Sequence, residues 1–236
     1  MLTLRKAHER GHTDLGWLNS YHTFSFGGYR DPKHMGFRAL RVLNDDRVAP
    51  GKGFGAHGHR DMEILSYVLE GGLAHKDSMG EQHVLGPNEV QAMSAGSGVI
   101  HSEYNASATD ATHFLQIWIV PSDEDLTPSY QQFAYAPSEK RGALRLIAGP
   151  ERGANPPAAF IHQDARMYAA VLGAGESISY AIPPGRHAWV QCATGRIEVN
   201  GLGLEEGDGL AVSGEPGLTV RGAGPQEGEL LLFDLA

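Results

Sequence analysis

Short apolar runs separated by turn residues recur along most of the chain, and this pattern limits the fold more than any other feature. The 236 residues include 31 glycines and 13 prolines, which are scattered rather than clustered. They separate strand-like runs such as MEILSYVLEG (62–71) and HFLQIWIVP (113–121). GFRALRVLNDD (36–46) reads as a further strand ending in an Asn-Asp-Asp turn. No segment of residues 36–120 keeps a 3.6-residue period, so the sequence predicts an all-β fold.

Two strand-rich halves of similar size flank a segment of different character. The segment begins with an acidic, proline-containing stretch, PSDEDLTP (121–128), and then has a helix-compatible run, 129–135. Strand-like runs resume at Leu144. We therefore expect a first domain at 1–120, a linker with a short helix at 121–143 and a second domain at 144–236. The halves are typical of a diverged tandem duplication.

Charge and cysteine content exclude several classes of protein. With 19 Lys and Arg against 28 Asp and Glu, the formal charge is −9, which disfavours nucleic acid or an anionic membrane as a partner. The single cysteine, Cys192, has no internal disulfide partner and is expected to pack as a small core residue. The chain start lacks the apolar run of a secretory signal, and no stretch reaches about eighteen apolar residues. We expect a cytoplasmic protein.

Histidines gather in the first half of the chain and form two spaced pairs with chemical meaning. His57 and His59 lie at positions i and i+2, and 42 residues later His101 and Glu103 repeat this spacing. In an extended chain, i and i+2 side chains project from one face. If the two segments pair in one small barrel, three imidazoles and one carboxylate converge. Such a donor set suits a transition metal, and an octahedral shell would keep two positions for substrate and for dioxygen or water.

Spacing alone does not choose the carboxylate. Glu63 follows His59 by four residues, so in a regular strand it shares the face of the two histidines, and Asp61 has the same parity. A β-bulge would change either assignment. From spacing, both Glu63 and Glu103 stay open as the oxygen donor.

Longer motifs resemble known families. The spacing Gly51-x5-His57-x-His59-x3-Glu63 resembles the first cupin motif. Gly96-x-Gly98-x2-His101-x3-Asn105 resembles the second, with glycine where proline is usual. More narrowly, the chain resembles the pirin family in four stretches: HTFSFGGYRDP (22–32), RVLNDDRVAPGKGFGAHGHRDMEILSYVLEG (41–71), HKDSMG (75–80) and VQAMSAGSGVIHSEYN (90–105).

The pirin resemblance implies a bicupin: two face-to-face β-barrels with one metal in the N-terminal barrel and none in the degenerate C-terminal barrel. The family's ligands fall on His57, His59, His101 and Glu103. Glu63 then becomes a structural residue or one that orients a ligand imidazole. The implied cofactor is one divalent transition metal, with Fe(II) favoured and Cu, Ni, Mn, Zn and Co as alternatives.

Activity is also implied by the resemblance. Similar proteins are quercetin 2,3-dioxygenases, which open flavonols with O2 and release CO, so a flavonol-like substrate and O2 are expected. Glu103 is the ligand best placed to accept the flavonol hydroxyl proton, and Phe54 and Met93 are candidate walls for a flat ligand. The alternatives are a redox-sensing regulatory protein without turnover and a cupin isomerase. With both barrels in one chain, we expect a monomer.

The remaining histidines are interpreted as structural. His22, Phe24 and Phe26 alternate in sequence and are expected to form a core-facing stripe on one strand. His162 and His187 are expected to be structural polar residues. One further group in or near strands is expected to be satisfied by local partners, with one member close to the metal: His75, His83 and His113.

Overall fold

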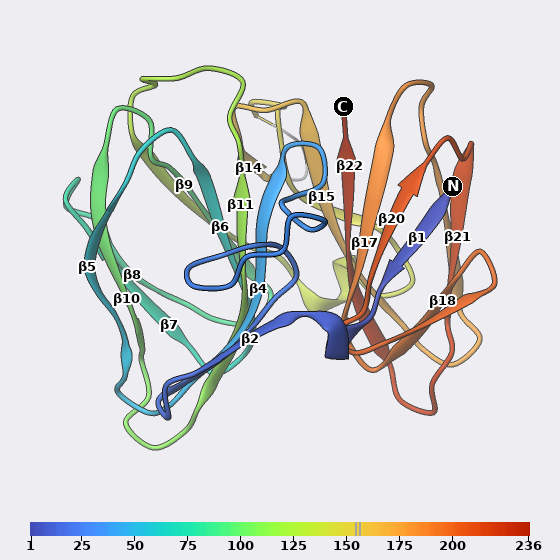
Figure 1. The fold of residues 1–236 in the computed structure, drawn as a ribbon, viewed down its shortest axis with the longest axis horizontal. Helices are drawn as coiled ribbons and strands as arrows, with labels where there is room; N and C mark the ends of the chain where they lie inside the picture. Colours follow the sequence, from blue (N-terminus) through green and yellow to red (C-terminus); the bar gives the residue numbers. More distant parts are fainter. Residues whose placement is uncertain (154, 156) are drawn as a thin grey trace. The chain divides into compact units, whose positions relative to one another are not determined.

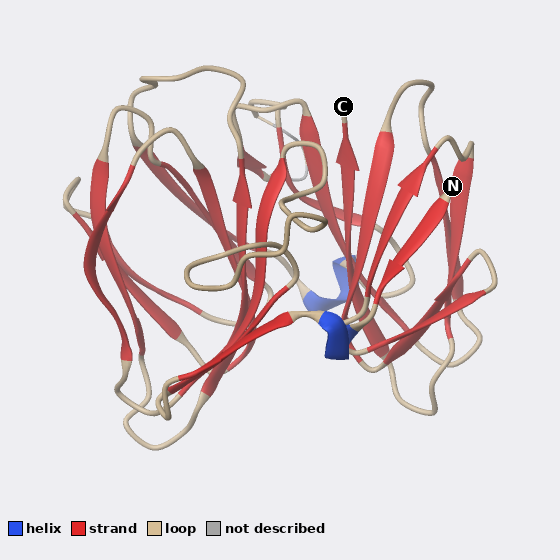
Figure 2. Cartoon of the chain, in the orientation of Figure 1, coloured by secondary structure: helices blue, strands red, loops and turns tan. Residues whose placement is uncertain are grey.

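A computed structural model describes residues 1–153, 155 and 157–236, and the regular secondary structure of the described part is almost entirely β-strand (Figures 1 and 2). The chain divides into two compact units. The N-terminal unit comprises Gly11–Tyr135 and Pro150–Gln163, and the C-terminal unit comprises Met1–Arg10, Ala136–Gly149 and Asp164–Ala236. This division differs from the continuous ranges 1–120 and 144–236, because the first ten residues belong to the C-terminal unit.

The N-terminal unit consists of a seven-stranded sheet in the order β12-β9-β6-β11-β4-β3-β2, a four-stranded sheet in the order β5-β10-β7-β8, and a two-residue strand, β14. The strands are β2 (Gly11–Asp14), β3 (Leu18–His22), β4 (Leu40–Val48), β5 (Gly53–His59), β6 (Glu63–Glu70), β7 (Leu73–Asp77), β8 (Gln82–Leu85), β9 (Glu89–Ser94), β10 (Val99–Asn105), β11 (Thr112–Ile119), β12 (Ser129–Ala134) and β14 (Ala159–Phe160).

The C-terminal unit repeats this plan. One sheet runs β1-β20-β17-β22-β15-β13 and the other runs β16-β21-β18-β19. Its elements are β1 (Leu2–Arg5), η1 (Ala7–Glu9), η2 (Pro137–Glu139), β13 (Arg145–Gly149), β15 (Ala165–Leu172), β16 (Ser177–Ala181), β17 (His187–Thr194), β18 (Arg196–Val199), β19 (Leu202–Glu205), β20 (Gly209–Ser213), β21 (Gly217–Gly222) and β22 (Gly228–Leu235). Leu2 and Leu4 of β1 pack on the core of this unit, which explains why the first residues belong to it.

The expectation of an all-β chain with two strand-rich units is confirmed, although each unit is a sandwich of a larger and a smaller sheet rather than the expected closed barrel. Cys192 lies in the apolar core of the C-terminal unit, as expected, and burial raises the pKa of its thiol to about 12. None of the described helices has the length and apolar character needed to cross a membrane.

The helix expected at residues 129–135 is wrong. Residues Ser129–Ala134 form β12, which pairs antiparallel with β9 from Ser129 opposite Ser94 to Ala134 opposite Glu89. The ladder of β9 offers hydrogen-bond partners that outweigh a weak local preference for helix. The helix of the 121–143 segment is instead the 3-10 turn η2, Pro137–Glu139.

The Asn-Asp-Asp turn is also wrong, because Asn44, Asp45 and Asp46 lie inside β4. All three side chains are buried. They are held in the middle of the seven-stranded sheet, where β4 pairs with β3 on one side and β11 on the other. Polar residues that resemble a turn in sequence are here the buried interior of a central strand.

Pairing between β5 and β10 joins the two sequence motifs. The strands run antiparallel with His101 opposite His57 and Val99 opposite His59, and the register shifts between His101 and Glu103. Gly53 faces this shift, because a Cβ atom there would lie 2.2 Å from the backbone oxygen of Glu103. The close approach of the two backbones therefore requires glycine at position 53.

We predict that Gly53→Ala lowers the free energy of unfolding by about 1–3 kcal/mol, because the added methyl forces β5 away from β10. Gly55→Ala on the same strand is the matched control, since its nearest neighbour would be the Tyr104 hydroxyl at 3.7 Å. We expect it to change stability by less than about 0.5 kcal/mol. Urea unfolding of the two variants and the wild type measures the difference; equal stabilities would contradict the prediction.

Candidate metal centre

Three histidines converge on the four-stranded sheet of the N-terminal unit. His57 and His59 of β5 meet His101 of β10, and their ligand nitrogens lie within 4.8 Å of one another. The Nε2 atoms of His57 and His101 are 3.1 Å apart, and the three ring centroids are separated by 4.5–4.8 Å. The structure thus brings together the three imidazoles singled out in the sequence, through strand pairing over more than forty residues.

Burial favours the neutral form of two of these imidazoles, His59 and His101. It lowers the pKa of His101 to about 3 and that of His59 to about 4, with the neighbouring imidazoles adding to the effect. His57 donates from Nδ1 to the backbone oxygen of Gly55 at 2.7 Å, which leaves the lone pair on Nε2. A metal binds the deprotonated nitrogen, so neutral rings with lone pairs directed at one point are the form that fits a metal ion.

Glu103 follows His101 by two residues in β10, and its side chain is buried. With His101 and His75 it forms a second group whose donor atoms lie within 4.8 Å of one another. Neutral side chains donate to both of its oxygens: Ser66 to Oε1 at 3.0 Å and Gln116 to Oε2 at 2.7 Å. No cation of the chain is among these partners, so the carboxyl is oriented but retains acceptor capacity toward the histidine cluster.

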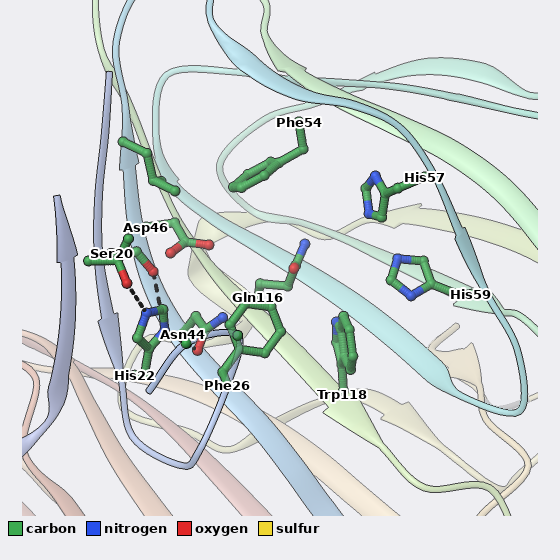
Figure 3. A pocket seen from close by; sticks show the side chains of 14 residues that line it. Ser20, His22, Phe26, Asn44, Asp46, Phe54, His57, His59, Gln116 and Trp118 are labelled. Atoms are coloured by element: carbon green, nitrogen blue, oxygen red, sulfur yellow. Dashed lines mark hydrogen bonds between the residues drawn. The ribbon is translucent and has the colours of Figure 1, made fainter. Parts of the chain in front are cut away.

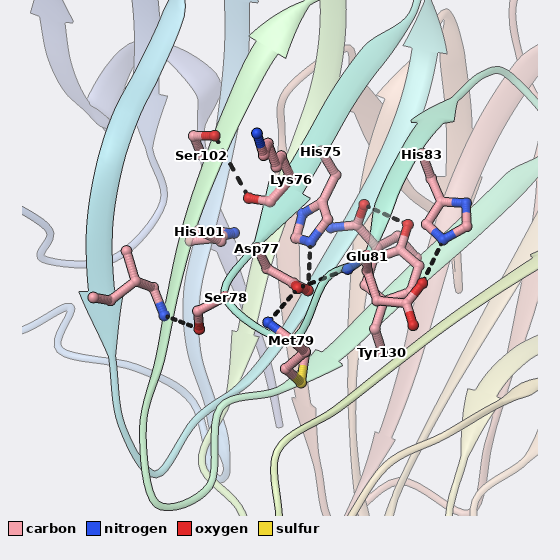
Figure 4. Close-up of polar contacts among 12 residues, drawn as sticks. His75, Lys76, Asp77, Ser78, Met79, Glu81, His83, His101, Ser102 and Tyr130 are labelled. Carbon is pink, nitrogen blue, oxygen red and sulfur yellow. Dashed lines mark hydrogen bonds and ion pairs between the residues drawn. The ribbon is translucent and has the colours of Figure 1, made fainter.

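His75 supports the cluster from the side of β7 (Figure 4). Its Nε2 donates to Asp77 Oδ2 at 3.0 Å, and Asp77 Oδ1 is held by backbone N–H groups of Met79 and Glu81. The ring packs on His101 with centroids 5.4 Å apart, and it stacks on Tyr130 at 4.7 Å. Among the remaining histidines, His75 is therefore the one beside the cluster; His83 pairs with Glu81 and His113 with Asp45.

Glu63 lies apart from the histidine cluster. It begins β6, in the other sheet, and the chain turns between β5 and β6 at Asp61, whose φ of 49° ends the strand alternation. The buried Glu63 carboxyl accepts from Ser94 Oγ at 2.9 Å and from His162 Nδ1 at 3.1 Å. Burial raises its pKa above the ordinary value. The imidazole that Glu63 contacts is therefore that of His162, which was expected from the sequence to be a structural residue.

A cavity of about 310 Å³ opens beside His57 and His59 (Figure 3). Phe54 lines it, as expected, whereas Met93 is wrong as a wall because it is fully buried in a separate core cluster. Trp118 packs edge-on against His59 with centroids 4.9 Å apart. The other lining residues are Thr13, Leu18, Ser20, His22, Phe26, Gly27, Gly28, Asn44, Asp46 and Gln116.

The core-stripe interpretation of His22, Phe24 and Phe26 fails in part. Strand β3 ends at His22, so the three residues do not share one strand. Phe24 is buried, but His22 and Phe26 line the cavity.

Comparisons with known proteins identify the family of this chain. Residues 3–119 match the Pirin family model, and residues 146–235 match the model described as the quercetinase C-terminal cupin domain. The chain is 44% identical over its whole length to a protein named quercetin 2,3-dioxygenase from Escherichia coli, covering 99% of that protein. The chain belongs to the pirin family. Among solved structures, YhhW from Escherichia coli is 43% identical with a TM-score of 0.94, covering 100% of this chain and 98% of YhhW. YhhW is also described as a bacterial pirin in complex with nickel(II), with a TM-score of 0.92 and coverage of 100% and 99%.

The polar wall of the cavity in this pirin was not predicted from the sequence. Ser20, His22, Asn44 and Asp46 come from β3 and β4. The signal was present in the sequence as two acids, Asp45 and Asp46, following an apolar strand without a glycine or proline to make a turn. The two side chains point to different surroundings. Asp45 accepts a hydrogen bond from His113 Nε2 at 2.7 Å, whereas Asp46 lines the cavity.

Burial raises the pKa of Asp46 to about 7. The nearby Asp45 and Glu103 carboxyls also raise this pKa, whereas a hydrogen bond from Ser20 lowers it. Below about pH 4 the group is protonated in both folded and unfolded chains. Between about pH 4 and pH 7 the carboxyl is ionised in the unfolded chain but still protonated in the folded one, so stability falls across this range and levels off above about pH 7.

We therefore predict that Asp46→Asn matches wild-type stability below pH 4 and exceeds it above pH 7, by up to about 4 kcal/mol in the metal-free protein. Asp45→Asn is the control: it breaks a buried hydrogen-bonded pair and should lower stability at neutral pH. Urea unfolding from pH 4 to 8 tests both, and an Asp46→Asn difference that does not change with pH would refute the assignment.

Proposed function

We propose that this pirin is a metal-dependent dioxygenase that opens the ring of flavonols with O2 and releases CO. The observation that carries the proposal is the cluster of three imidazoles, two of which, His57 and His59, line an apolar-sided cavity large enough for a flat aromatic ligand. Its relatives add support, since one is named quercetin 2,3-dioxygenase and YhhW is described with nickel(II).

His57, His59 and His101 would hold the metal through their ring nitrogens, with Glu103 as the oxygen donor. When bound, a divalent transition metal supplies Lewis acidity toward the flavonol 3-hydroxyl and electron exchange with O2. The donor set accepts Fe(II), which we favour, and also Cu, Ni, Mn, Zn and Co. Gln116 and Ser66 orient the Glu103 carboxyl through hydrogen bonds of 2.7 and 3.0 Å.

Glu103 would accept the proton of the flavonol 3-hydroxyl at a carboxylate oxygen. Its hydrogen-bond donors are neutral and fixed in buried strands, and no lysine or arginine of the described residues is hydrogen-bonded to the carboxylate. Phe54 and Trp118 form the apolar sides of the cavity and would exclude water from the ligand rings. In the reaction, one O2 oxidises the flavonol, both oxygen atoms enter the organic product, and one ring carbon leaves as CO.

The carboxylate assignment has a direct test in metal affinity. We expect His57→Ala, His101→Ala and Glu103→Gln each to weaken metal binding by at least about 100-fold, because each removes a donor. Glu63→Gln is the matched control: it removes a buried carboxylate that pairs with His162 instead, and affinity should stay within about threefold. Competition with a fluorescent chelator measures all four, and loss of metal in Glu63→Gln with retention in Glu103→Gln would reverse the assignment.

Turnover tests the function itself. Protein loaded in turn with Fe(II), Cu, Ni, Mn or Co should consume quercetin only with O2 present, seen as loss of flavonol absorbance with one CO released per ring opened. The His57→Ala/His59→Ala variant should be inactive with every metal. Absence of CO with all metals would favour the alternative, a metal-containing redox-sensing protein that binds partners without turnover.

A further inference from the structure

The Asp46 side chain lines the cavity on the side opposite the histidine cluster, and one of its carboxyl oxygens is unpartnered among the described residues. Asp46 is only 2% exposed, and its Oδ1 has no hydrogen-bond partner within the described part of the chain. In Figure 3 its carboxyl and the imidazoles of His57 and His59 lie on different sides of the cavity, separated by Gln116 and Phe54. A buried polar group left without a partner costs about 1–3 kcal/mol, so such groups in native proteins call for an explanation.

The neighbours of Asp46 are committed elsewhere. His22 donates from Nδ1 to Asn44 Oδ1 at 2.9 Å and accepts at Nε2 from Thr13 Oγ1 at 2.9 Å. Both ring nitrogens of His22 are therefore occupied, and the imidazole is held in one tautomer. Among the residues that line the cavity there is no lysine or arginine to neutralise Asp46. Ser20 is hydrogen-bonded to Asp46, and the nearby Asp45 and Glu103 carboxyls disfavour a negative charge on Asp46.

Shape and chemistry of the cavity indicate the ligand. Phe26, Phe54 and Trp118 supply aromatic surfaces along the cavity, while its two polar regions are the histidine cluster and the Asp46 wall. A flat aromatic molecule that reaches the histidines with one oxygen substituent can reach Asp46 with another. A phenolic hydroxyl is a good donor, and an unpartnered carboxyl oxygen in an apolar setting is a strong acceptor.

We propose that Asp46 determines specificity in this site by accepting a hydrogen bond at Oδ1 from a ring hydroxyl of the bound flavonol other than the 3-hydroxyl. This inference rests on the proposed function and refines it: the preferred substrates are polyhydroxylated flavonols rather than flavonols with a bare ring system. The raised pKa of Asp46, about 7, is consistent with an acceptor that gains from a donor supplied by the ligand.

Binding without turnover tests the inference on nickel-loaded protein under anaerobic conditions. The probes are 3-hydroxyflavone, which has only the 3-hydroxyl, galangin, which adds two hydroxyls on the fused ring, and quercetin, which adds two more on the pendant ring. Titration followed by fluorescence gives each Kd. In the wild type, we expect at least one polyhydroxylated probe to bind about 10-fold or more tighter than 3-hydroxyflavone, as for a hydrogen bond to a charged group.

The selectivity ratio is the Kd of 3-hydroxyflavone divided by the Kd of the tightest polyhydroxylated probe. Asp46→Leu should reduce this ratio to about threefold or less. Asp46→Asn, which keeps one acceptor oxygen and the side-chain size, should give an intermediate ratio. Asp45→Asn is the matched control, because Asp45 lies next in the same strand but outside the cavity lining; it keeps the Asp46 carboxyl and removes a charge that disfavours its ionisation, so its ratio should be at least that of the wild type. Circular dichroism verifies that each variant is folded, and Asp46→Asn remains informative if Asp46→Leu is not.

A wild-type ratio near one, or a high ratio that persists in both Asp46 variants, would overturn the inference while leaving flavonol binding intact. Wild-type protein that binds none of the three probes would overturn the proposed function and the inference with it. If binding is selective and depends on Asp46 but the turnover assay releases no CO, the role of Asp46 in ligand selection is supported. The protein would then bind flavonols without being a dioxygenase.

Discussion

The antiparallel pairing of β5 with β10 is the constraint on which the site depends. Its register places His101 directly opposite His57, so that residues more than forty positions apart in sequence are joined by one ladder. The shift after His101 changes which residue Glu103 faces, and Gly53 permits the close backbone contact at that point. A slip of one residue would turn the histidines to the opposite face of the sheet.

Burial then sets the chemistry of the groups that the strands bring together. It disfavours the charged form of His59 and His101, so that both rings keep a lone pair over the physiological range. The same burial raises the pKa of Asp46 and Glu63, but these two carboxyls differ in their surroundings. Glu63 accepts from Ser94 and His162 at Oε1 and leaves Oε2 without a hydrogen-bond partner among the described residues, as Asp46 does with Oδ1. The two carboxyls therefore differ in position, because Asp46 lines the cavity beside the histidines and Glu63 is not among its lining residues.

Much of the fold and of the histidine cluster was predictable because the signals are local. Turn residues between apolar runs indicate strands, and an i, i+2 pair of histidines in a strand must share a face. The helix at 129–135 and the turn at 44–46 were mispredicted, since β12 and β4 owe their conformation to pairing with β9, β3 and β11. Backbone hydrogen bonds to distant strands leave no mark in the local sequence.

The sequence by itself determined the strand-rich class, the pirin family and the histidines that converge, because periodicity and motif spacing are properties of the chain. Spacing left the carboxylate undecided and the family resemblance pointed to Glu103, which the structure places beside His101; tertiary structure alone decided which residues line the cavity and that Asp46 Oδ1 lacks a partner among the described residues. Glu63 and Glu103 have equal parity on paper, and only the turn at Asp61 and the placement of β6 in the other sheet separate them. The physical reason is that hydrogen-bond partners and burial are set by neighbours in space, which the order of residues along the chain does not specify.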